Sequence, residues 1–281
     1  MEVFQDLLSF RKFRENLRSD AKIGLVPTMG ALHEGHASLV RQSVAQNDIT
    51  IVTVFVNPTQ FGPNEDFEKY PRTLEKDCEL LERMGADIVL APQRSEVYPS
   101  DTQIYFQIRD LDKKLCGASR PGHMNGVVQV VSILFHITRP HHAYFGLKDY
   151  QQCLIIRQMV KELHFPLNVV PCEIIRENDG LALSSRNIYL SPEERTQALF
   201  LYQTMRHIKE NVASFRDVSE IRAFAERQMN QFPLVRPDYF EVLNDTNLQE
   251  VSALSPEENP HLFVAAFLGK TRLIDNMPLF G

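Results

Sequence analysis

The stretch from Lys22 to Val40 constrains the fold of this chain more than any other. It begins with a short apolar run, Ile23 to Val26, which is typical of a buried strand. We expect Pro27 to end that strand, because proline cannot donate to a sheet ladder. Small residues follow, and an apolar helical pattern starts directly after His36. The stretch therefore predicts a strand, a glycine-containing turn and a helix, where backbone N–H groups and the helix N-terminus can meet a phosphate.

Two histidines, His33 and His36, stand where this helix is expected to begin. Side chains three residues apart share one face if the turn is helical. Two imidazoles beside a helix N-terminus can donate hydrogen bonds to phosphate oxygens as negative charge develops. The alternative interpretation is a structural turn with two surface histidines. A zinc-protease site is excluded, because its His-Glu-x-x-His motif needs a spacing of four.

Length and composition place the chain among globular proteins. Its 281 residues can form one large domain or two smaller ones, and 43% of them are hydrophobic. The net charge of −6 argues against nucleic acid as a partner, so an anionic substrate would depend on local basic residues. The widely spaced cysteines form no C-x-x-C pair, which argues against zinc and a disulfide scaffold. The acidic start and the lack of a membrane-length apolar run favour a cytoplasmic protein with no membrane partner.

The order of expected elements predicts the fold class. Residues 48–57 are rich in β-branched side chains and are typical of a strand buried on both faces. A helix over 73–84 and a short strand over 88–91 follow. This alternation predicts an α/β fold, a Rossmann-like doubly wound parallel sheet that binds ligands at the carboxyl ends of its strands.

The two ends of the chain are expected to differ from this pattern. Residues before Lys22 are expected to form an amphipathic helix, whose apolar side consists of Phe4, Leu7, Leu8, Phe13 and Leu17. Ser191-Pro-Glu-Glu194 is a capping box that predicts one long helix to about Val212. Strands follow helices after this point. We therefore expect a Rossmann-like domain over 1–175 and a smaller C-terminal α+β domain over 176–281.

Four loops carry side chains suited to an ATP-dependent site. The first offers the two histidines, and the second offers Gln60, which can bond a carboxylate or a hydroxyl. The third offers Lys148, a point charge for phosphate. The fourth offers Ser184, Ser185 and Arg186.

Each of these side chains also has a plain alternative. Gln60 could be an ordinary turn residue, Lys148 a solvated surface charge, and Ser185 and Arg186 a helix cap. The sequence contains no Walker lysine motif, no G-x-G-x-x-G and no nucleophile elbow. Reaction at a phosphorus atom needs positioning and charge stabilisation rather than a protein nucleophile. The polar and basic side chains of the four loops therefore favour such a reaction.

Five motifs, in order along the chain, resemble those of the pantothenate synthetase (pantoate–β-alanine ligase) family of the His-x-Gly-His nucleotidylyltransferase superfamily. They are Pro27-Thr-Met-Gly-Ala-Leu-His-Glu-Gly-His36, Val54-Phe-Val-Asn-Pro-Thr-Gln-Phe-Gly62, Arg120-Pro-Gly-His123, Phe145-Gly-Leu-Lys-Asp-Tyr-Gln-Gln152 and Asp179-Gly-Leu-Ala-Leu-Ser-Ser-Arg-Asn187. The motifs cover most of the chain up to Asn187, and the C-terminal third matches more weakly. The sequence departs from the family at Thr59, Met124 and Leu147, where Met, Phe and Glu are common.

The resemblance implies condensation of pantoate with β-alanine to pantothenate through a pantoyl adenylate, with ATP converted to AMP and pyrophosphate. It implies catalytic roles for His33, His36, Lys148 and Arg186, with His36 as the catalytic acid. It also implies that Gln60 and Gln152 hold pantoate and that Gln60 meets β-alanine. The residues that it assigns to ATP are Met29, Gly30, Ala31, Leu32, His33, Glu34, Gly35, His36, Gly146, Leu147, Lys148, Asp149, Ile175, Leu183, Ser184, Ser185 and Arg186.

The resemblance further implies Mg²⁺ dependence, with unknown metal ligands, and a homodimer. Residues 1–175 would bind nucleotide and pantoate, and residues 176–281 would close over the site. The polar loop Phe61 to Pro71 is a candidate lid. Two alternatives remain: another nucleotidylyltransferase, which would release a stable nucleotide conjugate without any amine, and a non-catalytic protein that binds ATP without turnover.

Overall fold

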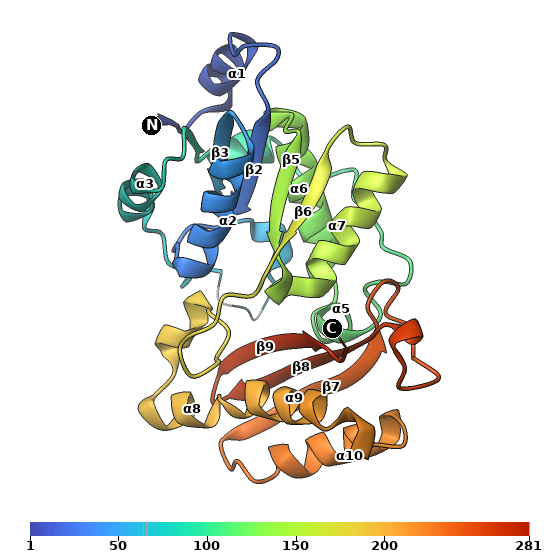
Figure 1. Cartoon of the computed structure of the whole chain (residues 1–281). Helices are drawn as coiled ribbons and strands as arrows, with labels where there is room; N and C mark the ends of the chain where they lie inside the picture. Colours follow the sequence, from blue (N-terminus) through green and yellow to red (C-terminus); the bar gives the residue numbers. More distant parts are fainter. Residues whose placement is uncertain (64, 66, 281) are drawn as a thin grey trace. The chain divides into compact units, whose positions relative to one another are not determined.

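The computed structural model describes every residue except Asn64, Asp66 and Gly281 (Figure 1). It divides into two compact units. The first unit comprises residues 1–110, 120–147 and 151–173. The second comprises residues 111–119, 148–150 and 174–281. The segments 111–119 and 148–150 therefore group with residues that lie far from them in the sequence.

The first unit is built on a six-stranded sheet in which all neighbouring strands are parallel. Its spatial order is β1 (Glu2–Phe4), β4 (Ile88–Leu90), β3 (Ile49–Val54), β2 (Ile23–Thr28), β5 (His142–Gly146) and β6 (Asn168–Cys172). Its helices are α1 (Leu7–Glu15), α2 (Glu34–Gln46), α3 (Leu74–Arg83), α4 (Arg94–Val97), α6 (His123–Thr138) and α7 (Tyr150–Glu162).

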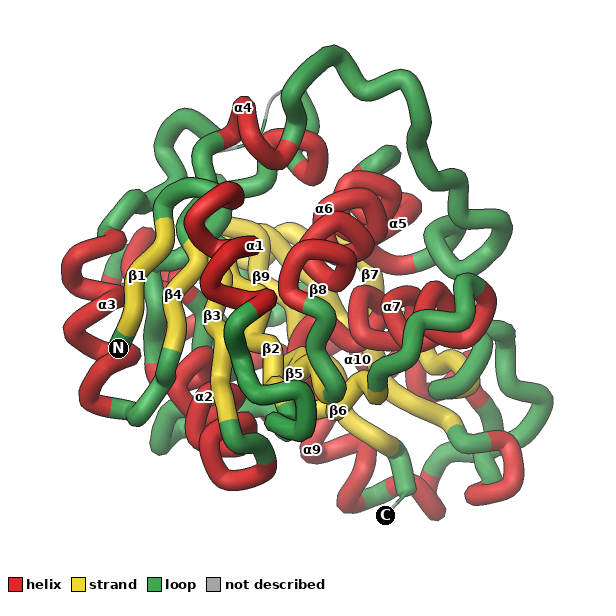
Figure 2. Tube along the Cα trace, turned by 90° about the horizontal axis from the view of Figure 1, so that it is seen from above, coloured by secondary structure: helices red, strands yellow, loops and turns green. Residues whose placement is uncertain are grey.

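Two consecutive residues of β5 show that helices cover both faces of this sheet (Figure 2). The hydroxyl of Tyr144 donates to the side chain of Gln46 in α2 at 2.9 Å. The ring of Phe145 lies with its centroid 6.4 Å from that of Phe135 in α6. Because consecutive side chains of a strand point to opposite faces, α2 and α6 lie on opposite sides. The doubly wound parallel sheet predicted from the sequence is confirmed.

The N-terminal segment differs from the prediction. Residues Glu2–Phe4 form β1, and α1 begins only after Asp6, whose side chain accepts from the N–H of Ser9 at 2.8 Å. Phe4 thus belongs to a strand, and Leu8 is 65% exposed. The helix expected before Lys22 is confirmed over Leu7–Glu15, but its extension to Phe4 is wrong. A strand of three residues is too short to show an alternating pattern.

The expectation that Pro27 ends its strand is also wrong, because β2 runs on to Thr28. Pairing of β2 with β5 is confined to Gly24 and Leu25. Pro27 lies beyond that pairing and keeps its register with β3, so its missing N–H removes no bond to β5.

The second unit combines an antiparallel sheet with helices, which confirms its predicted α+β class. The sheet has the order β7 (Val235–Asn244), β8 (Pro260–Leu268) and β9 (Thr271–Pro278). The helices are α5 (Leu115–Ser119), α8 (Pro192–Gln197), α9 (Phe200–Glu210) and α10 (Val218–Met229). The core of this unit includes Phe200, Met205, Ile221, Val242, Leu262 and Val264.

The long helix expected after Ser191 is broken into α8 and α9. Ser191 does cap α8, accepting from the N–H of Glu194 at 3.2 Å. At Ala198 and Leu199 the backbone takes ψ angles near −20°, typical of a 3₁₀ turn. The N–H of Leu201 accordingly bonds the carbonyl of Ala198 at 3.3 Å, and the expected continuous helix is wrong at this point.

Candidate active site

The turn after β2 is held by a buried carboxylate from α3. Gly30 and Ala31 both have left-handed backbones, with φ of 79° and 50°. Asp77, only 3% exposed, accepts from the N–H of Ala31 at 3.0 Å and from that of Leu32 at 2.9 Å. A Cβ on Gly30 would lie 3.0 Å from the Asp77 carboxylate, in a backbone conformation that favours glycine. Asp77 thus fixes the turn and was not predicted from the sequence.

His33 and His36 begin α2 through reciprocal hydrogen bonds. The Nδ1 atom of His33 accepts from the N–H of Gly35 at 3.1 Å, and Nδ1 of His36 accepts from the N–H of His33 at 3.3 Å. The two ring centroids are 4.1 Å apart. His33 has an extended backbone, with φ −134° and ψ 178°, so it is the N-cap and not a residue of the first turn.

These contacts determine where each neutral imidazole carries its proton. Because Nδ1 of both His33 and His36 accepts a hydrogen bond, the neutral tautomer has its proton on Nε2. An Nε2–H group can donate to an oxygen anion. The histidines therefore have a capping role in α2 and also the tautomer that a phosphate oxygen requires.

Gln60 lies in the short 3₁₀ helix that follows β3, and its side-chain amide is held on both sides. Asn57, fully buried, donates from Nδ2 to Oε1 of Gln60 at 3.1 Å. The Nε2 atom of Gln60 lies 3.1 Å from the sulfur of Met29. The structure therefore joins the predicted pantoate-binding residue to the first residue of the predicted ATP-binding turn.

The backbone around Gln60 is anchored to the start of α6. Nδ1 of His123 lies 2.8 Å from the carbonyl oxygen of Gln60, and Nε2 of His123 lies 2.9 Å from Arg120. Arg120 makes two contacts of 2.6 Å with the carboxylate of Glu65. Burial acts to raise the pKa of Glu65, but Arg120 outweighs it and holds the pKa below its usual range. The loop Phe61 to Pro71 also contains Asn64 and Asp66, which lie outside the described residues.

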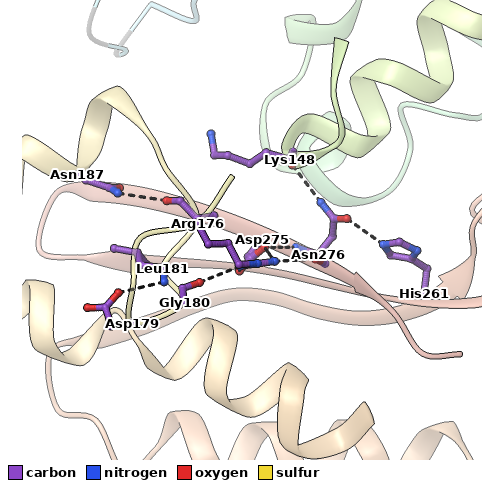
Figure 3. Close-up of polar contacts among 10 residues, drawn as sticks. Lys148, Arg176, Asp179, Gly180, Leu181, Asn187, His261, Asp275 and Asn276 are labelled. Atoms are coloured by element: carbon purple, nitrogen blue, oxygen red, sulfur yellow. Dashed lines mark hydrogen bonds and ion pairs between the residues drawn. The ribbon is translucent and has the colours of Figure 1, made fainter. Parts of the chain in front are cut away.

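In the second unit, Lys148 lies in a 3₁₀ turn that β9 and β8 support (Figure 3). Nδ2 of Asn276 donates to the carbonyl of Lys148 at 3.2 Å. Nε2 of His261 lies 2.9 Å from Oδ1 of Asn276, and since an amide oxygen only accepts, the histidine is the donor. Burial lowers the pKa of His261 to about 4, so this ring is neutral at pH 7.

The fourth predicted loop begins with a hairpin. The N–H of Leu183 donates to the carbonyl of Ile175 at 3.0 Å, and Arg176 pairs with Ala182. Ser184 then caps a 3₁₀ helix by accepting from the N–H of Arg186 at 3.2 Å. The structure thus brings Ile175, Leu183, Ser184, Ser185 and Arg186 into one hairpin and cap.

Arg176 ties this hairpin to β9. Its guanidinium bonds Asp275 through two contacts of 2.6 and 2.9 Å and donates to the carbonyl of Gly180 at 3.0 Å. The guanidinium carbon lies 4.7 Å from the ring centroid of Tyr202. Gly180 has φ of 101°, and a Cβ there would collide with Tyr202. Asp275 and Asn276 were not predicted as site residues.

The remaining predicted residues lie at the ends of neighbouring elements. Gly146 ends β5, Leu147 and Asp149 flank Lys148, and Gln152 lies in the first turn of α7. The carboxylate of Asp149 is 3.9 Å from the Nζ atom of Lys148.

The chain matches a known family over nearly its whole length. A family model described as pantoate-beta-alanine ligase matches residues 2–278. The chain belongs to the pantoate–β-alanine ligase family. It is 47% identical to the pantothenate synthetase of Thermotoga neapolitana over 98% of this chain and 99% of that protein. It is 50% identical to that of Acidobacterium capsulatum, over 95% of this chain and 91% of the relative.

Solved structures of this family share the fold. A pantothenate synthetase from Thermus thermophilus matches with a TM-score of 0.93 and 40% identity, over 100% of both chains. A pantoate-beta-alanine ligase from Francisella tularensis, in complex with beta-gamma ATP and beta-alanine, matches with a TM-score of 0.84 and 33% identity, over 99% and 98% of the two chains. The chain is accordingly an enzyme, an ATP-dependent ligase of pantoate and β-alanine. No helix in the part of the chain that the structure describes has the length and apolar character of a membrane span.

Proposed function

We propose that this ligase works in two steps at the residues that its motifs predict. In the first step a carboxylate oxygen of pantoate forms a bond to the α-phosphorus of ATP, and the bond to pyrophosphate breaks. In the second step the amine of β-alanine attacks the carbonyl carbon of the pantoyl adenylate, and AMP leaves. The adenylate is a mixed anhydride, so its second step needs no protein nucleophile.

The observation that carries this proposal is the tautomer of His33 and His36. Both rings have Nδ1 engaged with backbone N–H groups, so both can donate from Nε2 to phosphate oxygens where charge develops. In the proposed mechanism His36 is the acid, and Lys148 and Arg186 stabilise the triphosphate as fixed positive charges. The other predicted residues of the turn, from Met29 to Gly35, contact ATP.

Gln60 and Gln152 are proposed to hold pantoate. The contacts of Gln60 with Asn57 and Met29 give its amide a defined direction, with Nε2 as the donor for a carboxylate. Gln60 is also proposed to meet β-alanine in the second step.

The proposed cofactor is Mg²⁺, which would supply positive charge to the phosphates of ATP and to the departing pyrophosphate. Mg²⁺ usually keeps several waters and takes only one or two carboxylates from the protein. Two carboxylates of the predicted ATP set, Glu34 and Asp149, pair with Arg41 and Lys148, so no residue is assigned as a metal ligand. Among the described residues, no group of three metal-ligating side chains forms a cage of its own.

We also propose, from the family resemblance, a cytoplasmic homodimer with nucleotide and pantoate bound by residues 1–175. The C-terminal part, residues 176–281, and the loop Phe61 to Pro71 are proposed to close over the substrates. Sedimentation of the purified protein tests the dimer, and protease protection of the loop by ATP and pantoate tests the closure.

The experiment that tests the reaction measures AMP, pyrophosphate and pantothenate with each substrate omitted in turn. We expect sustained AMP formation only with ATP, pantoate and β-alanine together. Without β-alanine, a single equivalent of pyrophosphate per site should appear. A stable nucleotide conjugate formed without any amine would contradict the proposal and indicate another nucleotidylyltransferase. Binding of ATP without pyrophosphate release would indicate a non-catalytic protein.

A further inference from the structure

Two consecutive residues of β9, Asp275 and Asn276, are polar and almost completely buried, and they lie between the apolar residues Ile274 and Met277. Their exposed fractions are 3% and 5%. Burying a carboxylate and an amide is unfavourable unless both are fully hydrogen-bonded. Neither residue is among those predicted to touch a substrate, so their contacts must explain why they lie there.

The side chain of Asn276 lies on the face of the sheet that carries the turn of Lys148 (Figure 3). It accepts from His261 and donates to the carbonyl of Lys148, which sets the direction of its amide. His261 is itself held in a stack, with the ring centroid of Tyr150 at 4.5 Å and that of Phe263 at 4.8 Å. A neutral, packed imidazole therefore fixes an amide, and the amide fixes the backbone of the turn.

The side chain of Asp275 points to the opposite face, as alternation along a strand requires. There it receives both nitrogens of Arg176 in a bidentate pair, the strong form of a charge-assisted bond. Burial raises the pKa of Asp275, while Arg176 and the N–H of Asn276 favour its charged form. Arg176 in turn holds the carbonyl of Gly180 and packs over Tyr202, so Asp275 fixes the hairpin that leads to Ser184 and Arg186.

We propose that Asp275 and Asn276 are positioning residues of the ligase site. Asn276, oriented by His261, holds the backbone that carries Lys148, and Asp275 holds through Arg176 the hairpin that carries Ser184 to Arg186. This inference rests on the proposed roles of Lys148 and Arg186 at the triphosphate. One strand thus sets the geometry of both segments from its two faces.

The first test is a double-mutant cycle between Asn276→Asp and Lys148→Ala, with pyrophosphate release as the readout. Aspartate keeps the shape and the acceptor for His261 but loses the donor to the Lys148 carbonyl. If Asn276 acts through Lys148, we expect N276D to lower kcat/KM for ATP by up to about 10²-fold. In the K148A background the same change should have less than about a twofold effect, because the two residues form one unit.

Each outcome of this cycle has a distinct meaning. An unimpaired K148A enzyme would overturn the proposed role of Lys148. If K148A is impaired and N276D is not, only the positioning role of Asn276 is overturned. The same holds if N276D lowers kcat/KM equally in the wild-type and K148A backgrounds. If N276D does not fold, His261→Phe serves instead, since it keeps the ring stack and removes the donor that orients Asn276. The same pattern of coupling is expected, and its absence would be equally decisive.

The second test compares two Arg–Asp pairs whose aspartates lie in this sheet. Asp275→Asn weakens the pair with Arg176, and Asp238→Asn weakens the pair of Asp238 with Arg272, whose closest contact is 2.7 Å. We expect D275N to raise KM for ATP several-fold with little change in KM for pantoate. D238N should lower thermal stability without changing either constant. Parallel changes in the two variants would show that the Arg176 pair is merely structural.

Discussion

The buried carboxylate of Asp77 gives a quantitative test of how the proposed ATP-binding turn is held. Asp77→Asn keeps the size of the side chain but leaves one oxygen to accept from the N–H groups of Ala31 and Leu32. A bond to a charged acceptor contributes about 1.5–3 kcal/mol, and one such bond is lost in a site without solvent. We therefore expect the free energy of unfolding to fall by about 1.5–3 kcal/mol, which a domain of ordinary stability of about 5–15 kcal/mol can tolerate.

The same substitution should slow catalysis, although Asp77 is not among the residues predicted to contact a substrate. Ala31 keeps its left-handed backbone only while its N–H is held, so relaxation of the turn displaces the start of α2. A displacement of about 1 Å costs up to about 10²-fold in rate. Urea unfolding followed by circular dichroism measures the stability, and pyrophosphate release measures the rate. Glu79→Gln, on the exposed side of the same helix, is the control. An Asp77→Asn enzyme with unchanged stability and rate would refute the reasoning.

Three further predictions concern single side chains. His36→Ala should slow adenylate formation by about 10²–10³-fold, yet convert supplied pantoyl adenylate to the amide; equal loss in both half-reactions would count against this role. Gln60→Ala should weaken pantoate binding by about 1–3 kcal/mol for each polar group left unpaired, while the ATP affinity measured by calorimetry changes little. A loss of ATP affinity with unchanged pantoate kinetics would show that Gln60 does not bind pantoate. The pKa of His261 is about 4 in the fold against an ordinary value of 6.5, so between these values the unfolded chain binds a proton that the folded chain does not. Stability should therefore fall as the pH decreases from 6.5 to 4, by up to about 3 kcal/mol, and level off below that. His261→Gln should remove this part of the pH dependence, and an unchanged profile would show that another group causes it.

Local sequence patterns predicted the elements that carry the chemical groups. The apolar run before Pro27, the glycine in the turn and the apolar repeat after His36 indicate strand, turn and helix within 19 residues of chain, from Lys22 to Val40. Each of these signals depends only on neighbouring residues in the sequence, so it can be recognised without knowledge of the tertiary structure. The parallel sheet followed because several such units occur in succession.

The residues that orient those groups were not predictable in this way. Asp77 lies 46 positions after Ala31 on a helix rich in charged residues, and a helical carboxylate is usually solvated. The signal available for Asn276 was stronger, since Asp275 and Asn276 follow the apolar pair Leu273 and Ile274 in an expected strand, and buried polar residues need partners. The sequence does not reveal which partners, because Lys148 lies 128 positions away.

The two units hold the backbones of their turns with different side chains. The turn proposed to meet the phosphates keeps Ala31 at a φ of 50°, a backbone conformation that residues other than glycine disfavour. In the first unit a buried carboxylate accepts from the N–H groups of Ala31 and Leu32, and Nδ1 of His33 accepts from the N–H of Gly35. In the second unit an amide takes the carbonyl of Lys148, since an acid there would repel that oxygen. The supporting residue is thus an aspartate where backbone N–H groups are held and an asparagine where a carbonyl is held. N276D and D77N exchange these two side chains in opposite directions. Both variants are therefore expected to slow the first step.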